Sequence, residues 1–289
     1  MESKKKVLCI GLVCYDIVSV VDHFPIEDTQ MRTKEQRRSR GGNASNTSTV
    51  LSHLNIPCEF LGSLPSDSTP DLTFVEEDFE RHKITYDKCP RHKGHLLPNS
   101  CIISNSLTGS RTILHTNDGL PELRLEDISG IDFQNYSWIH IEGRPNANEI
   151  TKIAKMIKQN YPYIPISLEM EKPARANKEE LFQVLPFIDL LFISKECAFS
   201  LGAVNMADAA YLLGDILPKN ACIVCPWGEK GAAGKDARGN VFEVPCYPPP
   251  SGKNFFHIRP VNSMKSKNNL ITIKIDNLFI ITFSSRKCD

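Results

Sequence analysis

The chain has 289 residues, of which 41% are hydrophobic and 24% are charged, and its 34 basic side chains balance 34 acidic ones. This composition excludes a disordered, fibrous or highly charged chain, and the net charge of zero argues against nucleic acid as the main partner. The length suffices for one large domain or two modest ones.

The N-terminus, MESKKKVLCIGLVCYD, begins with charged residues and continues with a short apolar run that Asp16 interrupts. Such a run is too short for a signal peptide or a membrane anchor. We therefore expect a cytoplasmic protein with no membrane partner. The 10 cysteines are scattered through apolar runs, as at Cys9, Cys101 and Cys222, where we expect buried thiols and no disulfide framework.

Short β-branched runs alternate with amphipathic helical patterns as far as residue 245, which indicates βα units around a largely parallel, buried sheet. The expected strands are KVLCIGL, CEFLGSL, SWIHIEG, IPISLEM, DLLFIS and ACIVCPWG. The expected helices are 43–54, a segment with Leu72, Val75, Phe79 and His82 on one side, and a third with Ile150, Ile153, Ala154 and Ile157. The fold class is α/β, with helices on both faces.

Two segments, 15–40 and 97–119, do not follow this alternation. The second has β-rich arms around SLTGS, which predicts a hairpin, and the first contains strand-like pieces with many charges. We expect the two segments, from about 13–40 and 96–118, to form a small β layer beside the main sheet. Such a layer would act as a lid or as a dimer contact.

The start of the first helix, SRGGNASNTSTVLSHL, is rich in turn residues and amides. Glycines at 41 and 42 allow unusual dihedrals and a close approach of a ligand. Asn43 is expected as the N-cap, with Asn46 on the same face of the first turn. Amides both donate and accept, which suits sugar hydroxyls better than phosphate. The alternative is a capped helix after a glycine turn.

Two aspartates extend this candidate site. Asp16 follows the first expected strand, where open α/β sheets place ligand contacts, and Asp28 lies in the expected lid. Carboxylates bind vicinal hydroxyls through charge-assisted hydrogen bonds. The alternative is that both are solvated loop acids, an interpretation that the sequence favours for Asp28 more than for Asp16.

Several other motifs are excluded. GEKGAAGKD has five residues between Gly228 and Gly234, where a P-loop has four, and Asp236 stands where that motif requires Ser or Thr. Cys222 and Cys225 lie inside a strand-like run with no second pair to complete a zinc site. His115 and His140 are isolated, without metal spacing, and we expect neither to be catalytic.

The stretches GLVCYDIVSVVDHFPIEDT, RGGNASNTSTVLSHLNIPCEFLGSL, SWIHIEGR, LEMEKP, EELF and VCPWGEKGA occur in this order. Together they make residues 1 to about 250 resemble the ribokinase-like, or PfkB, carbohydrate kinases, and within them the ketohexokinase branch. The resemblance implies a three-layer α/β/α sandwich with a small β-sheet lid, and a homodimer formed through that lid. It also implies transfer of a phosphoryl group from ATP to fructose, with Mg²⁺.

The resemblance also implies roles for individual residues. The residues expected to bind the sugar are Asp16, Asp28, Gly42, Asn43, Asn46, Arg111 and Glu142. Those expected near the nucleotide are Arg111, Lys195, Trp227, Gly228, Glu229 and Gly231. Metal ligands are not assigned.

The C-terminus departs from the family pattern. The family supplies a Gly-Ala-Gly-Asp turn, with an anion hole and the base, shortly after a stretch like YPPP. Residues 251–289 contain no such turn, and Asp276 has no glycine turn before it. We therefore expect a kinase domain at 1–250, a divergent tail at 251–289, no catalytic base, and a fold lacking its C-terminal part. The alternatives are a non-catalytic sugar-binding or dimerising protein, or a kinase for another sugar or nucleoside.

Overall fold

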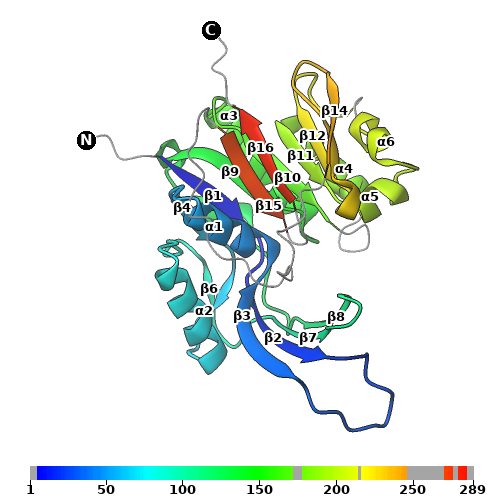
Figure 1. Ribbon diagram of the computed structural model, residues 1–289. Helices are drawn as coiled ribbons and strands as arrows, with labels where there is room; N and C mark the ends of the chain where they lie inside the picture. Colours follow the sequence, from blue (N-terminus) through cyan, green and yellow to red (C-terminus); the bar gives the residue numbers. More distant parts are fainter. Residues whose placement is uncertain (1–4, 172–177, 214–215, 246–269, 276–278, 285–289) are drawn as a thin grey trace.

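The computed structural model describes residues 5–171, 178–213, 216–245, 270–275 and 279–284. Its main sheet has eight strands in the order β14-β13-β12-β11-β10-β9-β1-β4 (Figure 1). In chain order these are β1 (Lys6–Ile10), β4 (Cys58–Leu61), β9 (Tyr136–Glu142), β10 (Ile166–Met170), β11 (Leu190–Ile193), β12 (Cys222–Pro226), β13 (Ala232–Lys235) and β14 (Val241–Val244). The strands from β4 to β12 are parallel, which confirms the six predicted strands, and β13 and β14 add an antiparallel edge.

Helices pack on both faces of this sheet, as the α/β prediction required. On β1, Leu8 and Ile10 join the core cluster that contains α3 (Ala147–Asn160), whereas Cys9 joins the cluster that contains α1 (Asn43–His53) and α2 (Pro70–Arg81). Because successive residues of a strand face opposite sides, these clusters lie on opposite faces.

The two longest helices follow the predicted periodicity. In α2, Thr69 accepts a hydrogen bond from the Leu72 amide and Pro70 opens the first turn, while Leu72, Val75 and Phe79 are buried. In α3 the buried side includes Ile150, Ile153, Ala154 and Ile157. The shorter helical elements are α4 (Lys178–Phe182), α5 (Lys195–Ser200), α6 (Met206–Tyr211), η1 (Leu125–Ile128), η2 (Phe133–Asn135), η3 (Leu185–Phe187) and η4 (Gly228–Lys230).

A second sheet of four strands, in the order β3-β2-β7-β8, projects from the main sheet (Figure 1). It consists of β2 (Cys14–Val21), β3 (Glu35–Gly41), β7 (Asn99–Asn105) and β8 (Arg111–Thr116), and we call it the lid sheet. The predicted hairpin is confirmed: β7 and β8 are antiparallel, and the Asn105 side chain closes the turn by accepting from the amides of Leu107 and Thr108. A further pair, β5 (Leu64–Pro65) and β6 (Arg91–His92), lies outside both sheets.

Part of the tail forms a hairpin of β15 (Leu270–Ile275) and β16 (Phe279–Ser284), with β15 running beside α1 (Figure 1). Residues 246–269 and Asp276 lie outside the described residues. The division into a domain at 1–250 and a tail at 251–289 stays a prediction.

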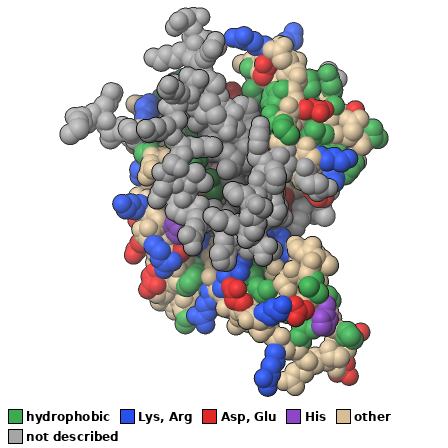
Figure 2. All heavy atoms as spheres, in the orientation of Figure 1, with side chains coloured by type: hydrophobic (Ala, Val, Ile, Leu, Met, Phe, Trp, Pro, Cys, Tyr) green, Lys and Arg blue, Asp and Glu red, His purple; other side chains and the backbone are tan. Residues whose placement is uncertain are grey.

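The surface and most of the cysteines agree with the composition. In the view of Figure 2, basic, acidic and hydrophobic side chains are interspersed over the described surface of the lid sheet. All eight cysteines in the described part of the chain are free thiols. Cys9 is buried as expected and Cys222 is half-buried, but the expected burial is wrong for Cys101, which is exposed on β7 of the lid sheet. No helix among the described residues is both long and apolar enough to cross a bilayer.

Candidate functional site

A cleft of about 620 Å³ lies between the lid sheet and the carboxyl ends of the main-sheet strands. Three elements contribute its polar side chains: the lid sheet, the start of α1, and the ends of β9 to β11 with the residues that follow. Parallel α/β sheets bind ligands at this edge. The cleft is therefore the candidate active site.

The lid contributes one row of polar side chains. Strand register places Asp16 on β2 opposite Ser100 on β7, and Ser100 opposite His115 on β8. All three line the cleft, and Ser100 Oγ lies 3.1 Å from His115 Nδ1. The Cys14 thiol donates to Asp16 Oδ1 at 3.3 Å. Arg111, at the start of β8, adds a positive charge to the same face.

The start of α1 depends on its two glycines. A Cβ on Gly42, whose φ is 96°, would lie 2.2 Å from the Leu12 carbonyl oxygen, and a Cβ on Gly41 would lie 2.1 Å from Asp16 Oδ2. Only glycine lets the helix begin so close to these groups. The expected N-cap, Asn43, is wrong by one position. The cap is Gly42, which has no side chain that could accept a hydrogen bond from the first turn.

Asn43 instead begins α1 and reaches across to the main sheet. Its Nδ2 donates to Glu169 Oε1 and to Glu171 Oε2, each at 3.1 Å. Asn43 and Asn46 both line the cleft, as their spacing predicted. The amide is therefore held by carboxylates at the end of β10.

Glu142 lies at the end of β9, buried beneath the helix start. Its Oε2 accepts from the amides of Leu12 at 2.9 Å and Ala44 at 3.1 Å. Burial raises the pKa of Glu142, while the nearby guanidinium of Arg144 opposes that shift. Glu142 thus links β1, β9 and α1, and it also lines the cleft.

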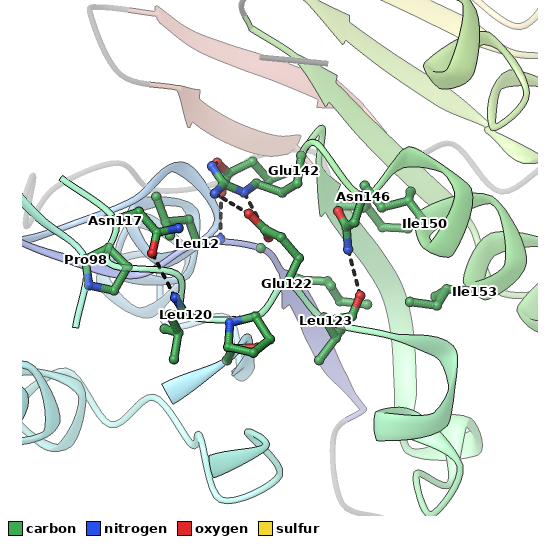
Figure 3. Close-up of a pocket in the computed structure, with 16 residues that line it drawn as sticks. Leu12, Pro98, Asn117, Leu120, Glu122, Leu123, Glu142, Asn146, Ile150 and Ile153 are labelled. Atoms are coloured by element: carbon green, nitrogen blue, oxygen red, sulfur yellow. Dashed lines mark hydrogen bonds and ion pairs between the residues drawn. The ribbon is translucent and has the colours of Figure 1, made fainter. Parts of the chain in front are cut away.

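Glu142 also borders a second, small cavity of about 30 Å³ (Figure 3). Here Arg144 lies 3.4 Å from Glu142 Oε1 and donates to Glu122 Oε1 at 2.6 Å. Glu122 belongs to the segment that returns from β8 to the main sheet, and Asn146 holds the same segment by donating to the Leu123 carbonyl at 2.7 Å. Figure 3 shows Glu122, Glu142 and Asn146 around the cavity.

The residues expected near the nucleotide divide into two sets. Lys195, at the start of α5, and Gly228, in η4, line the cleft. The Trp227 ring is buried behind them, with its centroid 4.9 Å from that of Phe199 and 5.6 Å from Lys195 Nζ. Gly231 packs against β14, where a Cβ would lie 1.9 Å from the Val244 carbonyl oxygen.

Three expected site residues, Asp28, Trp227 and Gly231, are not among the described residues that line this cleft. Asp28 lies in the exposed loop between β2 and β3, with a φ of 59°. The backbone of Glu229 is in η4, but its side chain lies outside the described part of the structure. The segment GEKGAAGKD forms η4 and the antiparallel strand β13, whereas a P-loop leads into a helix. Cys222 and Cys225 both lie in strand β12.

The sequence interpretation missed several residues that line the cleft. The most informative are Ser100, His115, Glu169, Glu171 and Glu196. A signal existed for Glu169, because HIE and LEM end two neighbouring parallel strands, and the register pairs Glu169 with Glu142. The sequence around His115 shows no metal spacing, and its place in the row with Asp16 follows only from strand pairing.

Comparisons with known proteins agree with this geometry. A model of the pfkB family of carbohydrate kinases matches residues 4–253. Ketohexokinase from Mus musculus is 38% identical over 253 residues, which cover 86% of this chain and 83% of the mouse protein.

Solved structures share the fold. Ribokinase from Giardia lamblia aligns with a TM-score of 0.70 at 17% identity, covering 85% of this chain and 76% of its own. Ribokinase from Cryptococcus neoformans var. grubii in complex with ADP aligns with a TM-score of 0.67 at 17% identity, covering 85% and 80%. The chain belongs to the pfkB family of carbohydrate kinases, and its sequence is ketohexokinase-like.

Proposed function

We propose that this ketohexokinase-like sugar kinase binds fructose in the cleft, and that phosphoryl transfer by this chain is strongly impaired. The observation that supports binding is the convergence of Asp16, Asn43 and Asn46, from two separate elements, on one cleft. A carboxylate and two amides offer the mixture of acceptors and donors that sugar hydroxyls require. Gly42 lets the helix that carries Asn43 and Asn46 begin close to the Leu12 backbone, and Glu142 supports this position from below.

The nucleotide would occupy the end of the cleft near Lys195 and Gly228. Lys195 and Arg111 would neutralise phosphate charge, and Trp227, Glu229 and Gly231 would shape the surrounding loop. Mg²⁺ is bound mainly by phosphate and water oxygens with one or two carboxylates. The ion would therefore arrive with ATP, whose phosphate oxygens are its main ligands. Glu171 and Glu196 are the carboxylates we propose beside it.

In the reaction, the carbon-1 hydroxyl of fructose attacks the γ-phosphorus, the bond to the β-phosphate oxygen breaks, and the hydroxyl proton passes to a base. Phosphoryl transfer needs chiefly positioning and charge neutralisation. Residues 251–289 lack the Gly-x-Gly-Asp turn that supplies the family's base and anion hole. Loss of a base typically costs roughly two to four orders of magnitude in rate, and loss of an anion hole about 3 kcal/mol more.

The lid sheet supports a second part of the proposal, a homodimer. All residues of β8 are exposed, and β8 is an edge strand of the lid sheet. Its Leu114 is 60% exposed, and Leu107 in the adjoining turn is 76% exposed. An exposed edge with apolar side chains is a site for pairing with another chain. In such a dimer, Asp28 would meet the sugar only from the partner's lid, since it lies away from its own cleft.

The test uses the full chain in a coupled assay of ADP release and in calorimetry with fructose. We expect binding heat with fructose and negligible ADP release. A chimera in which residues 251–289 are replaced by a family C-terminus containing Gly-Ala-Gly-Asp should gain activity by several orders of magnitude. Turnover by the unmodified chain near that of the chimera would contradict the impairment, and absence of binding heat would contradict the sugar site.

The absent turn also favours a second candidate, a non-catalytic protein that binds sugar or pairs with intact subunits. Mixing the chain with an intact ketohexokinase subunit distinguishes the two, because mixed dimers support the second candidate. A panel of ribose, adenosine and other hexoses, tested on the chimera, decides whether fructose is the preferred acceptor.

A further inference from the structure

The side-chain amide of Asn43 has only one orientation that its surroundings accept. Its Nδ2 lies 3.1 Å from carboxylate oxygens of both Glu169 and Glu171. An amide nitrogen carries two hydrogens, and a carboxylate can only accept. The reversed amide would place its oxygen against two carboxylates. Both N–H groups are therefore used, and Oδ1, an acceptor, is the polar atom of Asn43 that is left for a ligand in the cleft.

A row of side chains, buried except for the half-buried Trp138, leads through the main sheet to Glu169. On adjacent strands, Trp138 Nε1 donates to Ser167 Oγ at 2.9 Å, and Ser167 Oγ lies 2.9 Å from His140 Nδ1. His140 Nε2 lies 3.9 Å from Glu169 Oε2. Ser167, His140 and Glu169 are each at most 3% exposed, so water does not screen these contacts.

The hydrogen positions in this row follow from its ends. Indole N–H can only donate, so Ser167 Oγ accepts from Trp138 and has its own hydrogen to give. His140 Nδ1 at 2.9 Å is a better acceptor for it than the Ile139 carbonyl at 3.5 Å. The proton of a neutral His140 then sits on Nε2, 3.9 Å from Glu169 Oε2, a separation at which the contact is electrostatic and not a hydrogen bond. Burial lowers the pKa of His140 to about 4, which is consistent with the neutral ring.

We propose that Trp138, Ser167, His140 and Glu169 form a positioning relay for Asn43, which fixes that residue as a hydrogen-bond acceptor in the sugar site. The proposal rests on the proposed binding of sugar in the cleft. It specifies that the site recognises hydroxyl groups as hydrogen-bond donors. Asp16, the other anchor, is also an acceptor. The ligand must therefore present hydrogen-donating hydroxyls to both residues, and an analogue with fluorine at the position facing Asn43 lacks the donor.

The first test does not depend on sugar. In the full chain with ¹⁵N-labelled histidine, the ring nitrogen shifts and couplings of His140 at neutral pH should show the Nε2–H tautomer. Ser167→Ala removes the donor to Nδ1 and should shift His140 toward the Nδ1–H form. The matched control Ser48→Ala also removes a buried hydroxyl, one that donates to the Ser45 carbonyl, and should leave the tautomer unchanged. A wild-type Nδ1–H tautomer would overturn the relay.

The second test measures discrimination by calorimetry, as the ratio of affinities for fructose and for each of its singly deoxyfluorinated analogues. Wild type should prefer fructose by roughly tenfold or more at the position facing Asn43, since that analogue leaves a polar group unpaired. In Glu169→Gln the new side-chain amide can donate to the Asn43 oxygen, so the Asn43 amide can adopt the reversed orientation. The ratio of affinities for fructose and for the analogue at that position should therefore be smaller.

Glu59→Gln is the matched control, because Glu59 is a buried strand glutamate that pairs with Lys6 and Lys88 and lies outside the residues that line the cleft. It should leave the ratio unchanged. An unchanged ratio in Glu169→Gln would contradict the proposal. No heat with fructose in wild type would instead contradict the proposed function, and the tautomer measurement would still decide the relay.

Discussion

Arg144 and Glu142 form a buried ion pair at the base of the lid, with Arg144 Nη1 3.4 Å from Glu142 Oε1. The same guanidinium donates to Glu122, so one arginine joins the sheet, the start of α1 and the segment that returns from the lid. Arg144 is buried, but its two carboxylate partners raise its pKa above the ordinary value for arginine. Arg144 therefore stays charged in the folded protein.

Removing Arg144 should strongly destabilise the fold. Arg144→Met leaves the buried Glu142 without its positive partner, and breaking a buried pair in this way costs about 3–5 kcal/mol. Urea unfolding measures the change. Arg124→Met is the matched control, because Arg124 pairs with Glu126 at 3.1 Å on the surface, where such pairs contribute about 0–1 kcal/mol. Equal losses in the two variants would contradict the role of Arg144.

The buried His140 should make stability depend on pH. Its folded pKa is about 4, lowered by burial although Glu142 lies near it, and an unfolded histidine has a pKa of about 6.5. Because the pKa of His140 is lower in the folded than in the unfolded protein, its contribution to stability is complete above about pH 6.5. That contribution is lost as the pH falls toward about 4, the folded pKa. His140→Gln removes this titration. The stability of wild type relative to the variant should therefore fall by about 3 kcal/mol between neutral pH and pH ~4.

Urea unfolding at a series of pH values measures this difference. Glu142 and Glu169 are the charged groups that face His140 most closely, and both remain in the variant. His23→Gln, which changes an exposed histidine of the lid region, is the control and should show no comparable dependence. A pH-independent difference between wild type and His140→Gln would mean that His140 titrates as it does in the unfolded chain.

How far the sequence predicted the fold depended on local signal. The parallel strands were recognisable because they are short apolar runs buried on both sides, as in β11 (Leu190–Ile193). Strand β13, with the sequence AAGK, carries no such signal, and it forms because β12 offers an antiparallel partner. The lid hairpin was predicted from SLTGS, a purely local turn.

The site was predicted in the same uneven way. Asn43 and Asn46 are four-residue neighbours on one helix turn, so spacing alone placed them together. Glu169 meets Asn43 only because β10 lies beside β9 and α1 begins above both, a contact across 126 residues of sequence. No local pattern contains that relationship. The expected N-cap at Asn43 failed for the same reason, since the carboxylates of another strand hold its side chain.

Gly41 offers a test of the Asp16 position. A Cβ there would lie 2.1 Å from Asp16 Oδ2, at the far end of a flexible side chain. Gly41→Ala should therefore move the carboxylate while the lid sheet stays folded. Affinity for fructose should fall by about tenfold or more, as for loss of a hydrogen bond to a charged group. Gly130→Ala is the matched control, because no atom lies within 4 Å of the added carbon. Calorimetry should give the wild-type affinity for fructose in this variant.

The lid sheet is the surface on which two copies should pair. β8 is an edge strand with every residue exposed, and Leu114 is 60% exposed on it. A charge at this position would be buried without a partner in a lid-to-lid dimer, which is unfavourable. Leu114→Asp should therefore convert a wild-type dimer to a monomer, as measured by sedimentation velocity.

Val204→Asp is the matched control for this change. Val204 is 79% exposed and lies just before α6, in a part of the chain outside the lid sheet. The same charge placed there should leave the dimer intact, because it stays in water in either state. A monomeric wild type at micromolar concentration would contradict the dimer proposal. A dimer that survives Leu114→Asp but not Val204→Asp would place the interface on the side of α6, and Asp28 would then have no route to a partner's cleft.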